Sequence, residues 1–306
     1  MKKPDFFIIG APKCGTTAMN AYLSAHPQVF MAPEKEMHHF STDLDIPARA
    51  RFRDATTYLA QFADADGYQR VGEASVWYLF STKAAGNIYR FNPDAQIMAM
   101  LRNPVDMIYS LHSQLVFGDD EPLGNFEDAL IAEARRRTGH DLPKMVFAPI
   151  EALFYRNIPM YSQQLQRYFD MFGRSNVHVI LFDDFKTNTA GVYQDTLAFL
   201  NVDTDFRPDF EVVNANAVVK NRQLSNMLTA RRPNWYARTI LPAARRALPA
   251  HLRHNVNRRL RKAARQEVPR PKIPPHLRSE LEQHFSPEID RLSALLDRDL
   301  TLWLKE

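Results

Sequence analysis

The sequence contains a single cysteine, Cys14, and no long run of apolar residues. One thiol excludes an internal disulfide bond, and no cysteine cluster is present to bind a metal. No apolar run approaches the roughly 20 residues that cross a bilayer, and the start MKKPDFF lacks the apolar stretch of a secretory signal. We therefore expect a cytoplasmic protein, and its 306 residues, 45% of them hydrophobic, are enough to bury a substantial core.

The apolar residues follow two patterns that alternate along the chain. Short apolar runs typical of buried strands cover residues 6–10, 95–101 and 177–182. Runs with helical spacing cover residues 16–26, 105–117, 159–172, 192–200 and 281–300. Strands that alternate with helices are typical of a parallel sheet. The sequence therefore predicts an α/β fold in which helices flank a parallel sheet.

The loop between the first strand and the first helix, GAPKCGTTA, has the composition of an anion site. Gly10 and Gly15 let the backbone approach a ligand closely. A helix that starts at Thr16 or Thr17 points free N–H groups and its dipole at one spot. The two threonine hydroxyls add donors, and Lys13 would extend over the outer end of the anion. We expect a P-loop-like core that binds a phosphate.

The spacing in this loop differs from that of a nucleoside triphosphate loop. In that motif, Lys and then Ser or Thr directly follow the last glycine, and the hydroxyl holds magnesium. Here Lys13 precedes Gly15, and Cys14 lies between them, where we read its side chain first as a packing residue. Only the run at residues 179–184, VILFDD, places an acid after a strand in the way a magnesium site requires. A nucleotide bound without a metal fits these residues better.

A second strand-to-helix turn, LRNPVDMIYS, places Arg102 directly after a strand and Ser110 eight residues later. Pro104 suits the first turn of the helix, where its missing N–H costs no hydrogen bond. Together the two turns resemble the phosphate-binding motifs of sulfotransferases that use 3′-phosphoadenosine 5′-phosphosulfate (PAPS). The resemblance continues through residues 161–185, 196–202 and 286–303 and so covers most of the chain.

The resemblance implies a PAPS-dependent sulfotransferase and gives each of these residues a role. Lys13 would stabilise the oxygen that leaves the sulfur, and the loop Cys14–Thr17 would hold the 5′-phosphate. Arg102 would bind the 3′-phosphate through its planar donor fork, and Ser110 would add a hydroxyl donor. No metal is required for this chemistry.

The stretch KEMHHF, residues 35–40, follows the first helix and predicts the catalytic base. It resembles the Lys-Glu-x-His-Phe-Phe stretch of the heparan-sulfate type of sulfotransferase, in which the glutamate is catalytic. The resemblance implies that Glu36 takes the acceptor proton and that His38 orients Glu36 or the acceptor. A solvated charge run at Glu36, and His38 or His39 as the base, are the alternatives.

The acceptor side departs from the heparan-sulfate pattern at two positions. Ala74 stands where that group has the lysine of its Glu-Lys-Thr-Pro stretch, and Ser41 stands where it has an aspartate. The donor site is therefore better supported than any particular sugar polymer. Trp77 and Tyr78 are expected to be buried aromatic residues, with the acceptor cleft as the alternative.

The net charge of +4 conceals a strongly basic segment. Residues 231–272 contain thirteen Lys or Arg and one acid, a local charge of +12, and the rest of the chain carries −8. Five prolines predict short helices joined by turns there. This basic helical insertion would lie on an anionic membrane surface or be solvated, or it would attract an anionic acceptor or PAPS. Just before it, Lys220 and Arg222 resemble the late loop that completes the 3′-phosphate site.

The sequence thus predicts one sulfotransferase domain over residues 1–306. PAPS would be the donor, and a carbohydrate, glycolipid or small-molecule alcohol, or an amine, the acceptor. A small-molecule P-loop kinase and a non-enzymatic anion- or nucleic-acid-binding module are the alternatives. Nucleic acid is a poor fit as a partner, since no recognition motif accompanies the basic charge.

Overall fold

The computed structural model describes residues 2–210, 217–219, 265–267 and 271–305. The chain divides into two compact units, Met1–Glu211 with Ile273–Glu306, and Val212–Lys272. Lys220, Arg222 and most of the basic segment lie outside the described residues, so their roles stay predictions, as does the single domain.

The second unit contains one pair of described strands. β6 (Ala217–Val219) and β7 (Arg265–Glu267) pair antiparallel. We expected only short helices and turns around residue 265, which is wrong for β7. Pairing with a strand far away in the sequence leaves no local period that could reveal it.

The first unit is built on a five-stranded sheet in which every neighbouring pair of strands is parallel. The strands run in the order β2-β3-β1-β4-β5. Their bounds are β1 Phe6–Gly10, β2 Val29–Met31, β3 Arg70–Ala74, β4 Gln96–Leu101 and β5 Val177–Leu181. The residues of β1 are buried throughout, as expected for a central strand covered on both faces. The predicted α/β fold with a parallel sheet is confirmed.

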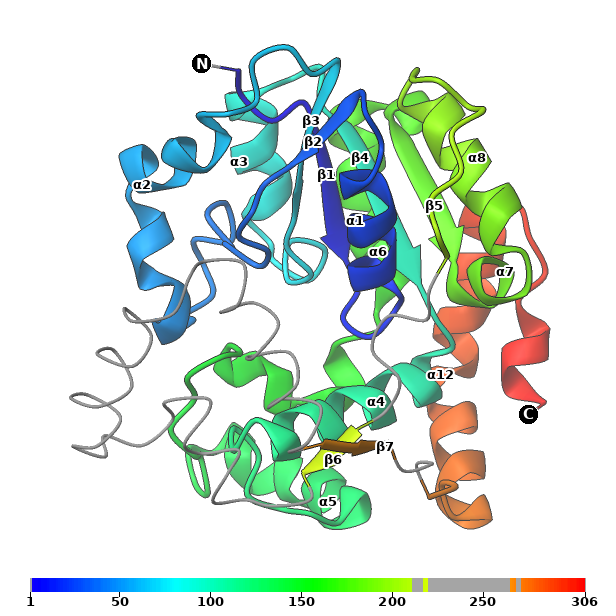
Figure 1. Ribbon diagram of the computed structural model, residues 1–306. Coiled ribbons are helices and arrows are strands. Elements are labelled where there is room, and N and C mark those ends of the chain that lie inside the picture. Colours follow the sequence, from blue (N-terminus) through cyan, green and yellow to red (C-terminus); the bar gives the residue numbers. More distant parts are fainter. Residues whose placement is uncertain (1, 211–216, 220–264, 268–270, 306) are drawn as a thin grey trace. The chain divides into compact units, whose positions relative to one another are not determined.

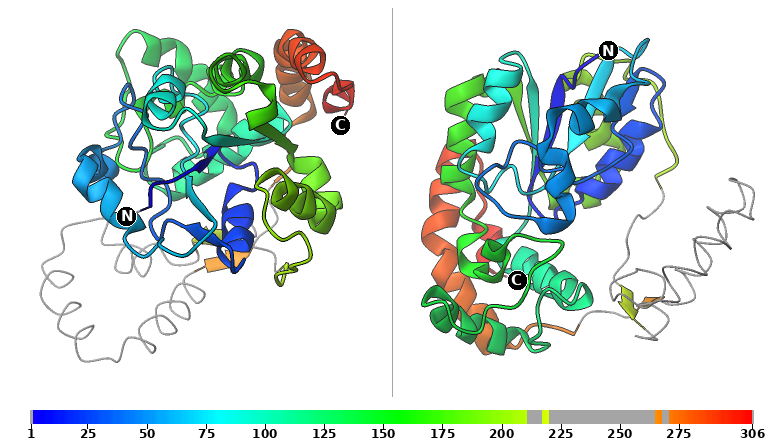
Figure 2. Two further views of the ribbon diagram at one scale, coloured as in Figure 1. Left: turned by 90° about the horizontal axis from the view of Figure 1, so that it is seen from above. Right: turned by 90° about the vertical axis from the view of Figure 1, so that its left-hand side faces the viewer.

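Helices cover both faces of this sheet. α1 and α8 lie on one face, and α3, α6 and α12 lie on the other (Figure 2). The helix bounds are α1 Thr16–Ser24, α2 Ala55–Leu59, α3 Ala84–Phe91, α4 Pro104–Phe117, α5 Phe126–Arg137, α6 Tyr161–Phe172, α7 Phe182–Thr187, α8 Thr189–Phe199 and α12 Pro275–Leu296. In the part of the chain that the structure describes, no helix combines the length and apolarity needed to cross a membrane.

The strand order sets where a ligand can bind. The arrowheads of β1, β4 and β5 point to the same edge of the sheet, where the loop after β1 and the start of α4 lie (Figure 1). The chain leaves β1 toward β2 on one side and leaves β4 toward β5 on the other. Parallel sheets bind ligands at the carboxyl ends of two strands that diverge in this way. The fold therefore places the predicted phosphate loop and Arg102 at the expected position.

Candidate active site

The loop after β1 turns sharply into α1. Gly15 is the N-cap of α1 with a left-handed backbone, φ +88°, and Lys13 is also left-handed, φ +63°. A Cβ at Gly15 would lie 3.1 Å from the ring of Phe185 and 3.2 Å from that of Phe182, both in α7. The glycine lets the loop pass close to α7, and the first N–H groups of α1 remain outside the helical hydrogen-bond pattern. This geometry supports an anion site.

Gly10 brings the phosphate loop against the turn that follows β3. Its φ is +134°, and a Cβ there would lie 2.3 Å from the carbonyl oxygen of Val76. The N–H of Leu79 donates to the carbonyl of Ile9 over 2.8 Å, so the two segments are also hydrogen-bonded. No side chain larger than hydrogen fits at Gly10.

Gly10→Ala should destabilise the fold by about 3 kcal/mol or more, because overpacking and an unfavourable positive φ each cost about 1–3 kcal/mol. Urea unfolding would measure the loss. Gly86→Ala in α3 is the matched control, since its Cβ would meet no atom within 4 Å. That control should stabilise by up to about 1 kcal/mol through helix propensity. Equal stability of Gly10→Ala and the wild type would contradict the close approach.

Arg102 follows β4 and joins the same site. Its Nη1 donates to the carbonyl of Lys13 over 3.4 Å, and its guanidinium lies 4.9 Å from the centre of the Phe182 ring. Asp106, in the first turn of α4, is 3.7 Å from Nη2. The hydrogen bond to the Lys13 carbonyl and the contact with the Phe182 ring hold the guanidinium beside the phosphate loop. This position suits a residue that binds a phosphate.

The C-terminal segment is hydrogen-bonded to the turn between β4 and α4. Asn103 caps α4 by accepting the N–H of Val105 over 2.9 Å. Its own amide donates to the carbonyl of Trp303, also over 2.9 Å. The strand-to-helix turn that carries Arg102 is thus fixed by residues 200 positions away in sequence.

The other residues that were predicted to bind PAPS differ in how exposed they are. Thr17 is half-buried at the start of α1, whereas the side chains of Thr16 and of Ser110 in α4 are buried. Cys14 is buried and its thiol donates to the carbonyl of Pro12. Burial raises the pKa of the Cys14 thiol to about 12, so the thiol stays protonated and unreactive near neutral pH. The packing role expected for Cys14 is confirmed.

Glu36 and Gly10 both lie against Val76, in the turn after β3. Its Oε2 accepts the N–H of Val76 over 2.9 Å, and its own N–H donates to the carbonyl of Ala74 over 2.8 Å. Lys35 pairs with Oε1. The Glu36 side chain is 24% exposed, so it is partly buried and is not part of a freely solvated charge run. The structure therefore brings the predicted base to the edge of the phosphate loop.

The charge state of Glu36 follows from these partners. Burial acts to raise the pKa of the carboxyl, but the charge of Lys35 and the hydrogen bond to His38 outweigh it, so the pKa is lowered. Glu36 is therefore ionised near neutral pH and able to accept a proton.

The two histidines have different surroundings. His38 Nε2 lies 3.3 Å from Glu36 Oε2, and the His38 side chain is only 3% exposed. His38 is thus a buried partner of Glu36 with little access to solvent. His39 stacks on Tyr58, with ring centres 4.1 Å apart, and its Nδ1 bonds the carbonyl of Phe52. Glu36 is therefore a better candidate for the base than either histidine.

A buried carboxylate beside this loop was missed from the sequence. Glu73 in β3 is fully buried and accepts hydrogen bonds from Ser75, Tyr58 and Tyr78. The sequence shows it only as one acid inside the short apolar run VGEA, in which Ala74 alone was compared with the heparan-sulfate pattern. Trp77 and Tyr78 are buried, as expected.

Asp183 and Asp184, the acids whose position after a strand resembled a magnesium site, are bonded to other side chains. Asp183 accepts the indole N–H of Trp303 over 2.7 Å, and Asp184 pairs with Arg298, also at 2.7 Å. Both acids thus hold the C-terminal segment. Among the described residues, no group of three or more His, Cys, Asp or Glu is placed to hold a metal ion.

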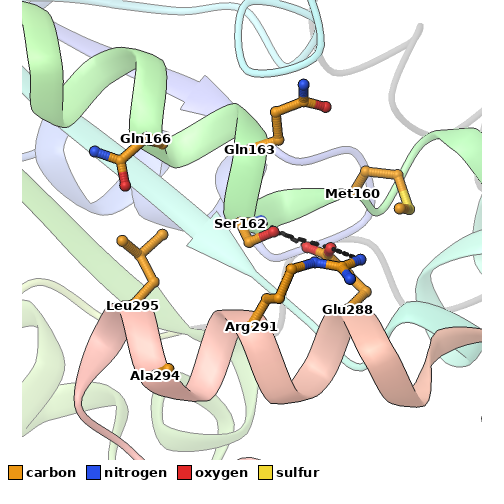
Figure 3. Close-up of a pocket in the computed structure, with 8 residues that line it drawn as sticks. All are labelled: Met160, Ser162, Gln163, Gln166, Glu288, Arg291, Ala294 and Leu295. Carbon is orange, nitrogen blue, oxygen red and sulfur yellow. Dashed lines mark hydrogen bonds and ion pairs between the residues drawn. The ribbon is translucent and has the colours of Figure 1, made fainter.

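A sizeable cavity lies apart from these residues. It has a volume of about 670 Å³ and lies between α6 and α12 (Figure 3). Its lining comprises Met160, Ser162, Gln163, Gln166, Glu288, Arg291, Ala294 and Leu295. Glu288 inside it is bonded to Ser162 and Arg291, so its charge is already satisfied. Among the predicted site residues that the structure describes, none lines this cavity.

Comparison with known proteins gives consistent matches. The sulfotransferase domain family matches residues 3–292. A solved sulfotransferase from Alicyclobacillus acidocaldarius is 32% identical, with 99% of each chain covered and a TM-score of 0.72. Carbohydrate sulfotransferase 15 of Homo sapiens is 25% identical over 249 residues, which cover 65% of this chain and 44% of that protein.

A further relative is the bifunctional heparan sulfate N-deacetylase/N-sulfotransferase 2 of Homo sapiens, 24% identical over 221 residues. The match covers 65% of this chain and 22% of that protein, so the chain spans less than half of either human relative. The family match covers nearly the whole chain, and the bacterial structure matches it end to end. The chain belongs to the sulfotransferase domain family.

Proposed function

We propose that the protein transfers a sulfuryl group from PAPS to a hydroxyl or amine of a glycan or small-molecule acceptor. The observation that carries this proposal is the contact between Arg102 and the carbonyl of Lys13 at the ends of β4 and β1. It joins the two turns that carry Lys13 and Arg102 at one point of the sheet edge.

The donor would lie along the edge formed by these two turns. The N–H groups at the start of α1, with Thr16 and Thr17, would hold the 5′-phosphate, and Lys13 would face the bridging oxygen. Arg102 would bind the 3′-phosphate with Ser110. Lys220 and Arg222 would complete that site, and all of these contacts are part of the proposal.

Transfer would proceed by direct displacement at sulfur. The acceptor oxygen or nitrogen forms a bond to sulfur, the bond from sulfur to the bridging oxygen breaks, and its electron pair stays on the phosphate. Negative charge grows on that oxygen, where Lys13 and the loop N–H groups stabilise it. Glu36 would take the proton of the acceptor as the new bond forms. These protein donors supply the positive charge that a metal supplies in a kinase.

The acceptor class is supported by relatives whose names specify carbohydrate and heparan sulfate. Both hydroxyl and amine acceptors fit Glu36 as base. The cytoplasmic location and the contact of the basic segment with an anionic membrane stay predictions.

Incubation of the protein with PAPS and a cell extract, followed by mass spectrometry, tests the proposal. Sulfated products should form together with adenosine 3′,5′-bisphosphate. Arg102→Ala should reduce both products at limiting PAPS. Phosphorylated products formed from ATP and magnesium, with none from PAPS, would favour a kinase instead.

A further inference from the structure

The loop with Glu36 and His38 is attached to β3 and its following turn by a row of hydrogen bonds. Two of them involve Glu36 itself, as described above. The N–H of His38 donates to Ser75 Oγ over 3.0 Å, and the N–H of Phe40 donates to the Tyr78 hydroxyl over 3.4 Å. Two side-chain hydroxyls therefore receive backbone N–H groups of the loop.

A hydroxyl can receive an N–H only with its oxygen lone pairs, so its own proton must point elsewhere. In both cases that proton points to Glu73. Ser75 Oγ donates to Glu73 Oε1 over 2.5 Å, and Tyr78 donates to both carboxylate oxygens over 3.0 Å. Tyr58 of α2 is a third donor, at 3.0 Å. The carboxylate thus fixes the direction of the hydroxyls that receive the loop.

The loop needs such support because its backbone is unfavourable. Glu36 has φ +63° and His38 has φ +56°, in the left-handed region that costs an ordinary residue about 1–2 kcal/mol. Strained residues persist where surrounding contacts hold them in place. Loss of the hydroxyl contacts would let the loop relax and move Glu36.

We propose that Glu73 is a positioning residue for sulfuryl transfer, which orients Ser75 and Tyr78 so that they hold the loop of Glu36 and His38. This role rests on the proposed function, since Glu36 acts as the base only if the protein transfers a group to an acceptor. Glu73 is buried, and its hydrogen bonds go to Ser75, Tyr58 and Tyr78.

The ionised form of Glu73 is the one that orders the loop. A carboxylate accepts from three hydroxyls at once, whereas a carboxylic acid must donate to one of them and turn its lone pairs away from the loop. Burial raises the pKa of Glu73 to about 7 against the effect of the three hydroxyls, and the charge of Glu36 raises it further. Activity should therefore rise with pH through about 7.

The other titratable groups around Glu73 do not account for a rise of activity through about pH 7. Tyr58 and Tyr78 have their pKa values raised, and Glu36 has its pKa lowered, so none of the three titrates near pH 7. Lys35 and His38 contact Glu36, and burial lowers the pKa of His38 below 6.5. Arg53, which interacts electrostatically with Tyr78, stays charged.

Kinetics of Glu73→Gln and Tyr78→Phe test the role. Both variants should lower kcat by about 10- to 100-fold, because small displacements of a catalytic group cost rates of this size. The dissociation constant of adenosine 3′,5′-bisphosphate should not change. Glu73→Gln should also lose the rise of kcat through about pH 7, and the amides of residues 36–40 should exchange hydrogen faster in both variants.

Glu288→Gln is the matched control, because Glu288 is also a buried carboxylate that accepts a serine hydroxyl, that of Ser162. It should leave the pH profile and the exchange of residues 36–40 unchanged. Stability gives a readout without turnover. The folded state binds the Glu73 proton more tightly between about pH 4.5 and 7, so stability from this group falls as pH rises through that window, and Glu73→Gln should remove the fall.

Wild-type turnover with PAPS separates the two possible failures. No transfer by the wild type would overturn the proposed function and, with it, the role of Glu73. Normal wild-type turnover together with unchanged kcat, pH profile and hydrogen exchange in both variants would overturn the positioning role alone.

Discussion

Replacing Lys13 with alanine should lower kcat by about 10²- to 10³-fold, the usual loss when one donor to a developing negative charge is removed. The affinity for adenosine 3′,5′-bisphosphate should change much less. The charge that Lys13 stabilises grows in the transition state, so its effect appears in turnover rather than in ground-state binding.

Arg102→Ala should show the opposite pattern. The 3′-phosphate has the same charge before and after transfer, so Arg102 contributes to binding in every state of the reaction. A hydrogen bond to a charged group contributes about 1.5–3 kcal/mol, equivalent to a roughly 10- to 100-fold weaker affinity. Steady-state kinetics and titration calorimetry would measure both variants.

Lys186→Ala provides the charge-matched control, since Lys186 is exposed on α7. It should leave both turnover and affinity unchanged. Equal losses of bisphosphate affinity in Lys13→Ala and Arg102→Ala would contradict the division of roles between the two turns.

Glu36→Gln should reduce turnover by about 10²-fold or more while binding of the bisphosphate survives. The substitution keeps the size of the side chain but removes its capacity to accept a proton. His38→Ala should cost less, because His38 is buried and contacts Glu36 instead of taking the proton itself. The pKa of Glu36 is lowered, so wild-type activity should not be lost through this group until the pH falls below the usual range of a carboxyl.

The neighbouring Glu34→Gln is the control for Glu36→Gln. The Glu34 side chain is 42% exposed and pairs with Arg49 and Arg51, so its replacement should leave turnover unchanged. Near-wild-type activity of Glu36→Gln combined with an inactive His38→Ala or His39→Ala would mean that a histidine is the proton acceptor.

The parts of the fold that could be predicted from sequence are those with an uninterrupted apolar run. β1 was placed to the residue and β4 and β5 to within one residue, because buried parallel strands are apolar on both faces. β2 has only three residues, and β3 contains Arg70, Gly72 and Glu73, so neither shows such a run. Phe182, expected to end a strand, begins α7 and lies under Arg102.

The site could be predicted where chemistry follows a strand end directly. Lys13 follows the end of β1 closely and Arg102 follows β4 directly. Because β1 and β4 are parallel neighbours, the residues after their ends lie close together. The partners of Glu36 could not be predicted in this way, since Glu36 and Gly10 are brought near one another only by Val76 in the turn after β3. The role of Glu73 depends on the hydroxyls of Tyr58 and Tyr78, which only the folded chain brings to one point.

The binding of adenosine 3′,5′-bisphosphate with a chelator present tests the central claim most directly. At 100 times its dissociation constant the bisphosphate should stabilise the wild-type protein by about 2.7 kcal/mol in thermal melts, and the gain should shrink in Arg102→Ala at the same concentration. Stabilisation by ATP with magnesium, and none by the bisphosphate, would contradict the PAPS site.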